Sequence, residues 1–150
     1  MVSASRESVR LYLRELKNIA VYEKKVETVK VTGPDGDSTE IDISGKFLGL
    51  PWRGTFSVNF TPDGGFRSTM TRGPLKKMTG GFHLRPVSGG TIVTHEEQYQ
   101  FPLPLRPMTR LIRRWLEHTM DVELRVIKEG AERLNRSIQL QETELQQLRP

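Results

Sequence analysis

Three residues with side chains suited to proton transfer or hydrogen bonding alternate along one segment of the chain. His95, Glu97 and Tyr99 are spaced two residues apart. Side chains two apart on a β-strand point to the same face, so the three are expected to lie together. A carboxylate beside an imidazole orients the ring and raises its pKa, which suits general acid–base catalysis. The same groups can instead hydrogen-bond a ligand or one another, and the sequence leaves these roles open.

Other reactive constellations are missing from the sequence. The absence of cysteine excludes disulfides, thiolate zinc sites and cysteine nucleophiles. The histidines and carboxylates show no metal-ligand spacing, so no metal site is predicted. The glycines flank turns and strands rather than a junction from strand to helix, so neither a phosphate-binding loop nor a cofactor is predicted.

Positive charge is concentrated in the middle of the chain. The 150 residues carry 23 Lys and Arg against 18 Asp and Glu, yet residues 43–116 hold eleven basic and only three acidic residues. This excess is either a solubility surplus or a face that meets anionic lipid or RNA. The strongly apolar run from Ile19 to Tyr22 is too short to span a bilayer, and no secretory segment fits the first residues. A cytoplasmic protein is expected.

Hydrophobic periodicity predicts the elements that position these residues. Ser5 is the expected N-cap of a helix over 5–16, and residues 17–25 form a second short helix or turn. Alternation predicts strands at 26–31, 40–47, 52–60, 66–71, 78–85 and 91–101. A helix from Pro107 to about residue 137 follows. Its expected apolar stripe is Met108, Leu111, Ile112, Trp115, Thr119, Val122, Val126 and Leu134.

This order of elements is typical of an α+β helix-grip architecture. A curved antiparallel sheet of about six strands needs its apolar face covered, and only the C-terminal helix is long and apolar enough. A cavity is expected between them, with Trp115 facing Phe56. Its expected lining is Trp52, Phe56, Phe82, His95, Glu97, Tyr99, Trp115 and Thr119. Residues 1–137 form the domain, and 138–150 form a helical extension.

Local motifs in the same order carry a family resemblance. They are the entry into the first helix over Val2–Val9, the passage Leu13–Val31, the segment Gly90–Val93 followed by Tyr99, and Leu103-Pro104 before the long helix. This arrangement resembles the START/SRPBCC superfamily, especially its small bacterial polyketide cyclase/dehydrase and coenzyme-Q-binding-like members. The resemblance implies a START-like fold that binds a hydrophobic small molecule or lipid without covalent chemistry.

The resemblance also implies a full strand before the first helix, of which only Met1-Val2 remain. The outer edges of strands 26–31 and 91–101 are then expected to lack a neighbouring strand. Three arrangements remain open: a longer natural start, a homodimer that pairs an edge, or an edge covered by the C-terminal extension.

Two further functions remain open beside ligand binding. The first is a polyketide cyclase/dehydrase-like enzyme in which His95, Glu97 and Tyr99 orient the substrate. The second is an RNA- or ribosome-binding module, as in the related ribosome-associated toxin family. A basic patch at one end of the sheet would serve that module, or contact an anionic membrane through the apolar residues beside it. It comprises Arg72, Lys76, Lys77, Arg106, Arg110, Arg113 and Arg114.

Overall fold

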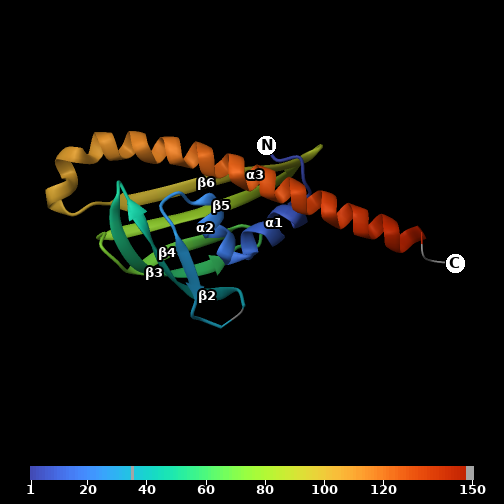
Figure 1. Cartoon of the computed structure of the whole chain (residues 1–150), viewed down its shortest axis with the longest axis horizontal. Coiled ribbons are helices and arrows are strands. Elements are labelled where there is room, and N and C mark those ends of the chain that lie inside the picture. The colour runs from blue at the N-terminus through green and yellow to red at the C-terminus, as the bar shows by residue number, and fades with distance from the viewer. Residues whose placement is uncertain (35, 148–150) are drawn as a thin grey trace.

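The computed structural model describes residues 1–34 and 36–147, with the side chains of all of these except 104–106. Two short helices and a 3-10 turn precede six strands, and a second 3-10 turn leads into one long helix (Figure 1). In chain order the elements are α1 Arg6–Arg14, η1 Leu16–Asn18, α2 Ile19–Tyr22, β1 Thr28–Val31, β2 Ser38–Phe47, β3 Leu50–Phe60, β4 Phe66–Arg72, β5 Lys77–Val87, β6 Gly90–Gln100, η2 Leu103–Met108 and α3 Thr109–Gln147. The predicted α+β helix-grip fold is confirmed.

The first helix begins and packs as the sequence predicts. The Ser5 hydroxyl accepts a hydrogen bond from the Ser8 backbone N–H at 3.1 Å, which satisfies a donor that the helix itself leaves free. Val9 and Leu13 are buried one turn apart, and Leu16 continues the same apolar face. The N-terminal helices therefore belong to the hydrophobic core of the sheet.

The strands form one antiparallel sheet in the order of the chain, β1 to β6. Alternate residues are buried, among them Ile41 and Ile43 in β2 and Phe56 and Val58 in β3. A register shift between Thr55 and Phe56 marks an irregularity that increases the local twist. The sheet therefore curves, with its apolar face toward the helices.

The long helix α3 packs on α1, α2 and β6 and runs beside β6 (Figure 1). Its buried face is Ile112, Leu116, Thr119, Glu123, Ile127, Gly130 and Ala131. The predicted stripe is wrong at its start, because Met108 is 45% exposed and Leu111 is 61% exposed. Apolar residues occupy more than one face of this helix. The short helices and β6 beneath it therefore decide which face is buried.

Gly130 has no side chain, and this allows α1 and α3 to approach closely. A Cβ atom at Gly130 would lie 2.4 Å from ring atoms of Tyr12. Glycine in a helix interior costs about 1 kcal/mol relative to alanine. At this position the glycine permits a contact between the two helices, and a larger residue would have to move the Tyr12 ring.

The two edges of the sheet are β1 and β6. Val2 forms a single antiparallel bridge with Thr91, through two backbone hydrogen bonds of 2.9 Å. Residues 139–147 are exposed, and the end of α3 projects beyond the sheet (Figure 1). The described part of the C-terminal extension therefore covers neither edge, which corrects that alternative. The longer start, the homodimer and the boundary at residue 137 stay predictions.

No helix within the described residues combines the length and hydropathy needed to cross a bilayer.

Replacement of Gly45 tests how the segment after α2 is held against the sheet. A Cβ atom there would lie 1.9 Å from the Lys25 carbonyl oxygen. We expect Gly45→Ala to lower the free energy of unfolding in urea by about 1–3 kcal/mol, because two backbones must separate. The matched change Gly36→Ala, whose Cβ meets nothing within 4 Å, should alter it by less than about 0.5 kcal/mol. Equal stability of the two variants would contradict the close approach.

Candidate functional site

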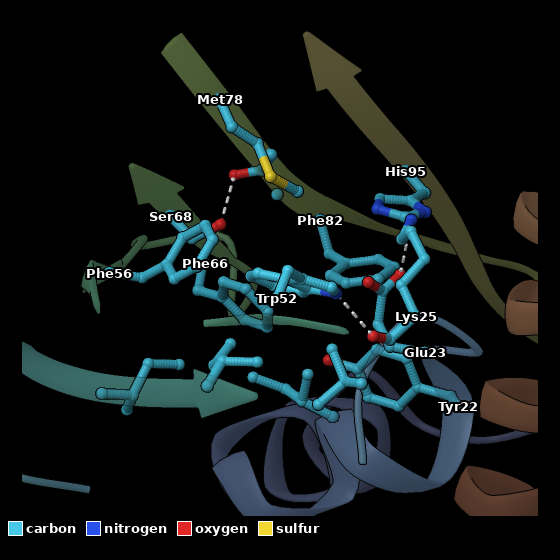
Figure 2. Close-up of a pocket in the computed structure, with 16 residues that line it drawn as sticks. Tyr22, Glu23, Lys25, Trp52, Phe56, Phe66, Ser68, Met78, Phe82 and His95 are labelled. Atoms are coloured by element: carbon cyan, nitrogen blue, oxygen red, sulfur yellow. Dashed lines mark hydrogen bonds and ion pairs between the residues drawn. The ribbon is translucent and has the colours of Figure 1, made fainter. Parts of the chain in front are cut away.

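A small inner cavity lies between the sheet and the segment that contains α2 and the residues after it. Its volume is about 50 Å³. Aromatic and aliphatic side chains form most of its wall, and Tyr22, Glu23, Lys25 and His95 form a more polar end (Figure 2). Its lining residues are Ile19, Tyr22, Glu23, Lys25, Val26, Ile41, Ile43, Trp52, Phe56, Phe66, Ser68, Met78, Gly80, Gly81, Phe82 and His95. No described residue of α3 lines it, which corrects the expected position between sheet and long helix. The N-terminal helices occupy that side of the sheet instead.

A second, outer pocket of about 220 Å³ lies at the end of the sheet where β2 turns into β3 and β4 turns into β5. Its wall is almost entirely apolar, formed by Phe47, Leu50, Pro51, Trp52, Met70, Pro74, Leu75 and Phe101. Trp52 lines both spaces. Its indole N–H donates a 3.0 Å hydrogen bond to the Lys25 carbonyl oxygen, which fixes the position of the ring in the inner cavity wall (Figure 2).

A buried cluster of charged and polar groups surrounds Lys25 at the polar end of the cavity. The Lys25 ammonium lies 3.1 and 3.3 Å from the two carboxylate oxygens of Glu97 and 3.2 Å from the Tyr99 hydroxyl. Oxygens of Glu23 and Glu123 lie at 3.4 and 3.5 Å. Only 2% of the Lys25 side chain is exposed. A buried ammonium is tolerated only when such partners replace water.

His95 lies between two of these carboxyl groups. Its Nε2 atom is 3.7 Å from Glu97, and its Nδ1 atom is 3.6 Å from Glu123. Both separations are too long for hydrogen bonds. The imidazole ring stacks on Phe82 with centroids 4.2 Å apart, so its orientation is fixed by packing. Tyr99 donates a 2.8 Å hydrogen bond to Glu97, which completes the cluster on β6.

Burial and mutual repulsion decide the protonation of the cluster. Burial, followed by the nearby charge of Glu23, raises the pKa of Glu123 to about 9, so this carboxyl group is protonated at neutral pH. Burial lowers the pKa of His95 despite the carboxylates of Glu97 and Glu23. Burial also opposes the charge of Lys25, but Glu23 and Glu97 outweigh it and hold its pKa well above the usual value. At neutral pH the lysine is therefore charged and the histidine neutral.

Four side chains of this cluster are possible metal ligands that the sequence spacing did not reveal. Donor atoms of Glu23, His95, Glu97 and Glu123 lie within 4.8 Å of one another. The Lys25 ammonium lies among the same carboxylate oxygens, 3.1 Å from Glu97. A metal ion bound to all four groups would have to share the Glu97 carboxylate with this resident ammonium.

The residues predicted as a site are divided among three places. Trp52, Phe56, Phe82 and His95 line the inner cavity. Glu97 and Tyr99 belong to the polar cluster behind it. The remaining two lie on α3: the Thr119 hydroxyl donates to the Leu116 carbonyl oxygen, and Trp115 packs edge-to-face on Phe47 at 5.0 Å.

The aromatic partners differ from those predicted. Phe56 packs on Trp52 at 6.3 Å, whereas Trp115 packs on Phe47, so the predicted pairing of Trp115 with Phe56 is wrong. The reason is the position of α3 beside β6, which brings its first turns over the turn at the end of β2 rather than over the middle of β3.

Sequence reasoning missed Glu23, Lys25 and Glu123. The first two stand in the run Glu23-Lys24-Lys25, which reads as a solvated connection. Glu123 carries a usable signal, because it lies four residues after Thr119 and four before Ile127, on the buried face of the helix. A carboxylate on a buried helical face needs a partner elsewhere, and that requirement indicates a buried polar site.

The predicted basic patch lies on the surface around the outer pocket. Its members Arg72, Lys76, Lys77, Arg110, Arg113 and Arg114 are exposed, and the side chain of Arg106 lies outside the described part. Five exposed apolar residues lie near these basic residues, and we call this group the apolar tip. They are Leu48, Leu50, Leu103, Met108 and Leu111.

Comparison with known proteins identifies the architecture. No protein-family model and no curated protein matches the sequence. Among solved structures, TTHA0849 from Thermus thermophilus superposes with a TM-score of 0.78 at 19% identity, over 87% of this chain and 91% of that one. The Zhui aromatase/cyclase from Streptomyces sp. R1128 superposes with a TM-score of 0.71 at 15% identity, over 88% of this chain and 89% of that one. A START superfamily protein from Mycobacterium smegmatis superposes with a TM-score of 0.68 at 14% identity, over 89% of this chain and 93% of that one.

The chain has the START-like helix-grip fold. The predicted resemblance is confirmed at the level of architecture, with aromatase/cyclase and START proteins among the structural neighbours. The inner cavity of this helix-grip protein is smaller than the roughly 300 Å³ typical of small-ligand sites. Trp52 is the described residue that lines both this cavity and the outer pocket, and the volumes of the two spaces together approach that size.

The protonated state of Glu123 gives the protein a stability that depends on pH. Its pKa is raised from 4.5 to about 9, so between these values the folded chain holds a proton that the unfolded chain has lost. Stability therefore falls as pH rises. The lowered pKa of His95 has the opposite sign, but it acts below its ordinary value of 6.5.

We therefore expect the free energy of unfolding to fall between pH 6.5 and about pH 9, by up to about 1.4 kcal/mol per pH unit. Glu123→Gln should flatten this slope, and Glu129→Gln, an exposed change on the same helix, should preserve it. Urea unfolding at several pH values measures it. An unchanged slope in Glu123→Gln would refute the assignment. The neighbouring titratable groups are Tyr22, Glu23, Lys25, His95, Glu97 and Tyr99.

Proposed function

We propose that this protein binds a hydrophobic small molecule or lipid that enters through the outer pocket, displaces the Trp52 indole and reaches the inner cavity. The observation that carries the proposal is that one side chain, the Trp52 indole, lines both apolar spaces. Movement of one indole would join them, at the cost of its 3.0 Å hydrogen bond to Lys25. Such a bond contributes only about 0.5–1.5 kcal/mol, which ligand burial can offset.

The polar cluster gives the ligand a preferred orientation. Tyr22, Glu23, Lys25 and His95 form one end of a wall that is otherwise apolar (Figure 2). A ligand with one polar group would place that group at this end and its apolar part against the aromatic rings. A few convergent polar groups in an apolar pocket are typical of sites that bind one class of molecule.

Binding is favoured over cyclase/dehydrase-like catalysis by the position of the three candidate residues. Of His95, Glu97 and Tyr99, only His95 lines the cavity. The ammonium of Lys25 engages both carboxylate oxygens of Glu97, and Tyr99 donates to the same group. A general acid or base must reach its substrate within hydrogen-bond distance, and these two residues face each other instead.

A cavity-filling change tests the proposal directly. Ser68 lines the inner cavity, and the next residue of β4, Thr69, points to the opposite face of the sheet. We expect Ser68→Leu to weaken binding of naphthalenemethanol by at least about tenfold, because the larger side chain occupies the space that the ligand needs. Thr69→Leu should leave affinity unchanged. Isothermal titration calorimetry measures both variants against the natural chain.

Mass spectrometry of an organic extract of the purified protein gives an independent test. We expect an apolar compound in the extract of the natural chain and less of it in the extract of Ser68→Leu. If the natural chain retains no apolar compound and binds no naphthalene derivative, the proposed function is wrong.

The apolar tip and the basic patch support a second proposal, peripheral contact with an anionic membrane. Leu50 is 71% exposed at the rim of the outer pocket, and Lys76 and Lys77 are exposed in the neighbouring turn. Each basic residue near an anionic surface contributes about 1 kcal/mol. Contact there would bring the outer pocket to a lipid source.

Vesicle sedimentation tests this contact. We expect salt-sensitive binding to vesicles that contain phosphatidylserine and weak binding to neutral phosphatidylcholine vesicles. Replacement of Lys76, Lys77, Arg110 and Arg113 by glutamine should reduce binding by at least about a hundredfold, because the attraction of four positive charges to the anionic surface is lost. Equal binding of the natural chain to both kinds of vesicle would refute the electrostatic contact.

A further inference from the structure

The buried cluster contains more hydrogen-bond acceptors than donors. Five buried atoms here have no hydrogen-bond partner among the described residues: the Tyr22 hydroxyl oxygen, Oε1 of Glu23, both side-chain oxygens of Glu123, and Nδ1 of His95, and each of them can accept a hydrogen bond. The side chain of Glu123 is fully buried, and that of His95 is 4% exposed. An unsatisfied buried polar atom costs about as much as a lost hydrogen bond, so these atoms indicate a missing donor.

The imidazole of His95 presents an acceptor toward Glu123. Its Nε2 atom faces the Glu97 carboxylate at 3.7 Å, which favours the tautomer that carries its proton on Nε2. In that tautomer Nδ1 holds a lone pair. This lone pair lies 3.6 Å from Oε2 of Glu123, where two acceptors would otherwise face each other. The proton that Glu123 retains at neutral pH relieves that conflict.

Lys25 does not supply the hydrogen-bond donors that these acceptors lack. Its ammonium is already engaged by both oxygens of Glu97 and by Tyr99, at 3.1–3.3 Å. Three carboxyl groups, those of Glu23, Glu97 and Glu123, lie around this single cation. Because Glu123 is protonated, the carboxylates of Glu23 and Glu97 face one ammonium, and a second cationic donor would balance their charge, whereas an anionic ligand would meet additional repulsion.

The walls of the cavity suit a cation with an apolar body. Aromatic rings of Tyr22, Trp52, Phe56, Phe66 and Phe82 line it. The faces of such rings attract ammonium groups, and their apolar surface accepts hydrocarbon. Glu23 belongs to the same lining, so a carboxylate is in reach of a bound molecule.

We propose that the ligand is a hydrophobic amine, bound as its ammonium form with the nitrogen at Glu23 and His95, which line the cavity, and the apolar part along the aromatic wall. This inference rests on the proposed function, because it assigns the class of molecule that the same cavity takes. An ammonium offers three donors and no acceptor, which matches the atoms left without partners. An alkylamine is protonated in water at neutral pH, so it binds as the ammonium beside the Glu23 carboxylate without a proton transfer.

Three ligands with one shared ring system separate this inference from the proposed function. Naphthylmethylamine, naphthalenemethanol and naphthoic acid differ only in the charge and donors of the polar end. Calorimetric titration of the full chain at neutral pH should show the amine binding at least about tenfold more tightly than the alcohol, and the acid binding most weakly. If none of the three binds, the proposed function fails. If the alcohol or the acid binds as tightly as the amine, the cavity is a ligand site but the amine inference is overturned.

Glutamine variants then test which carboxyl group the bound ammonium contacts. Glu23→Gln removes a carboxylate that lines the cavity without changing shape, and it should reduce the preference for amine over alcohol to less than about threefold. Glu129→Gln, an exposed change on α3, should keep the full preference. A preference that survives Glu23→Gln would place the amine elsewhere and overturn the assignment. Because the readout is a ratio of two affinities in the same variant, a general loss of stability does not imitate it.

Discussion

The structure depends on a lysine ammonium buried among carboxyl groups. Transfer of a charge from water to a protein interior is costly unless partners of opposite sign surround it. Lys25 finds these partners in Glu97 on β6 and Glu23 just after α2, and the protonated carboxyl group of Glu123 on α3 lies 3.5 Å from the same ammonium. The cluster therefore ties the sheet, the long helix and the N-terminal segment together at one point. Loss of one partner would leave buried charge uncompensated.

The backbone of Lys25 is held as firmly as its side chain. Its carbonyl oxygen accepts a hydrogen bond from Trp52, and Gly45 leaves the space for that carbonyl against β2. Since Gly45 and Trp52 face each other across the β2–β3 pair, one register position serves both contacts. The tryptophan that lines both apolar spaces is thereby anchored to the residue at the centre of the polar cluster. In the proposed function, ligand entry past this side chain would therefore break a contact with that residue.

Elements with strong periodicity could be predicted from the sequence, and contacts between distant elements could not. Alternation along β3 and the N-cap at Ser5 depend on neighbouring residues, and both are observed. The buried face of α3 depends on what lies beneath it, so Leu111 was misplaced on that face. His95, Glu97 and Tyr99 were found because a strand places alternate residues together. Their partners Lys25 and Glu123 lie 72 and 26 residues from Glu97 along the chain, and only the tertiary fold brings them into contact.

A crystal structure of the chain grown with naphthylmethylamine tests the central claim most directly. We expect electron density for the naphthalene rings between Phe56 and Phe82, an indole of Trp52 turned away from the Lys25 carbonyl oxygen, and a nitrogen within hydrogen-bond distance of Glu23 or His95. Density for the ligand only on the outer surface, with Trp52 still bonded to Lys25 and the inner cavity unchanged, would contradict that claim.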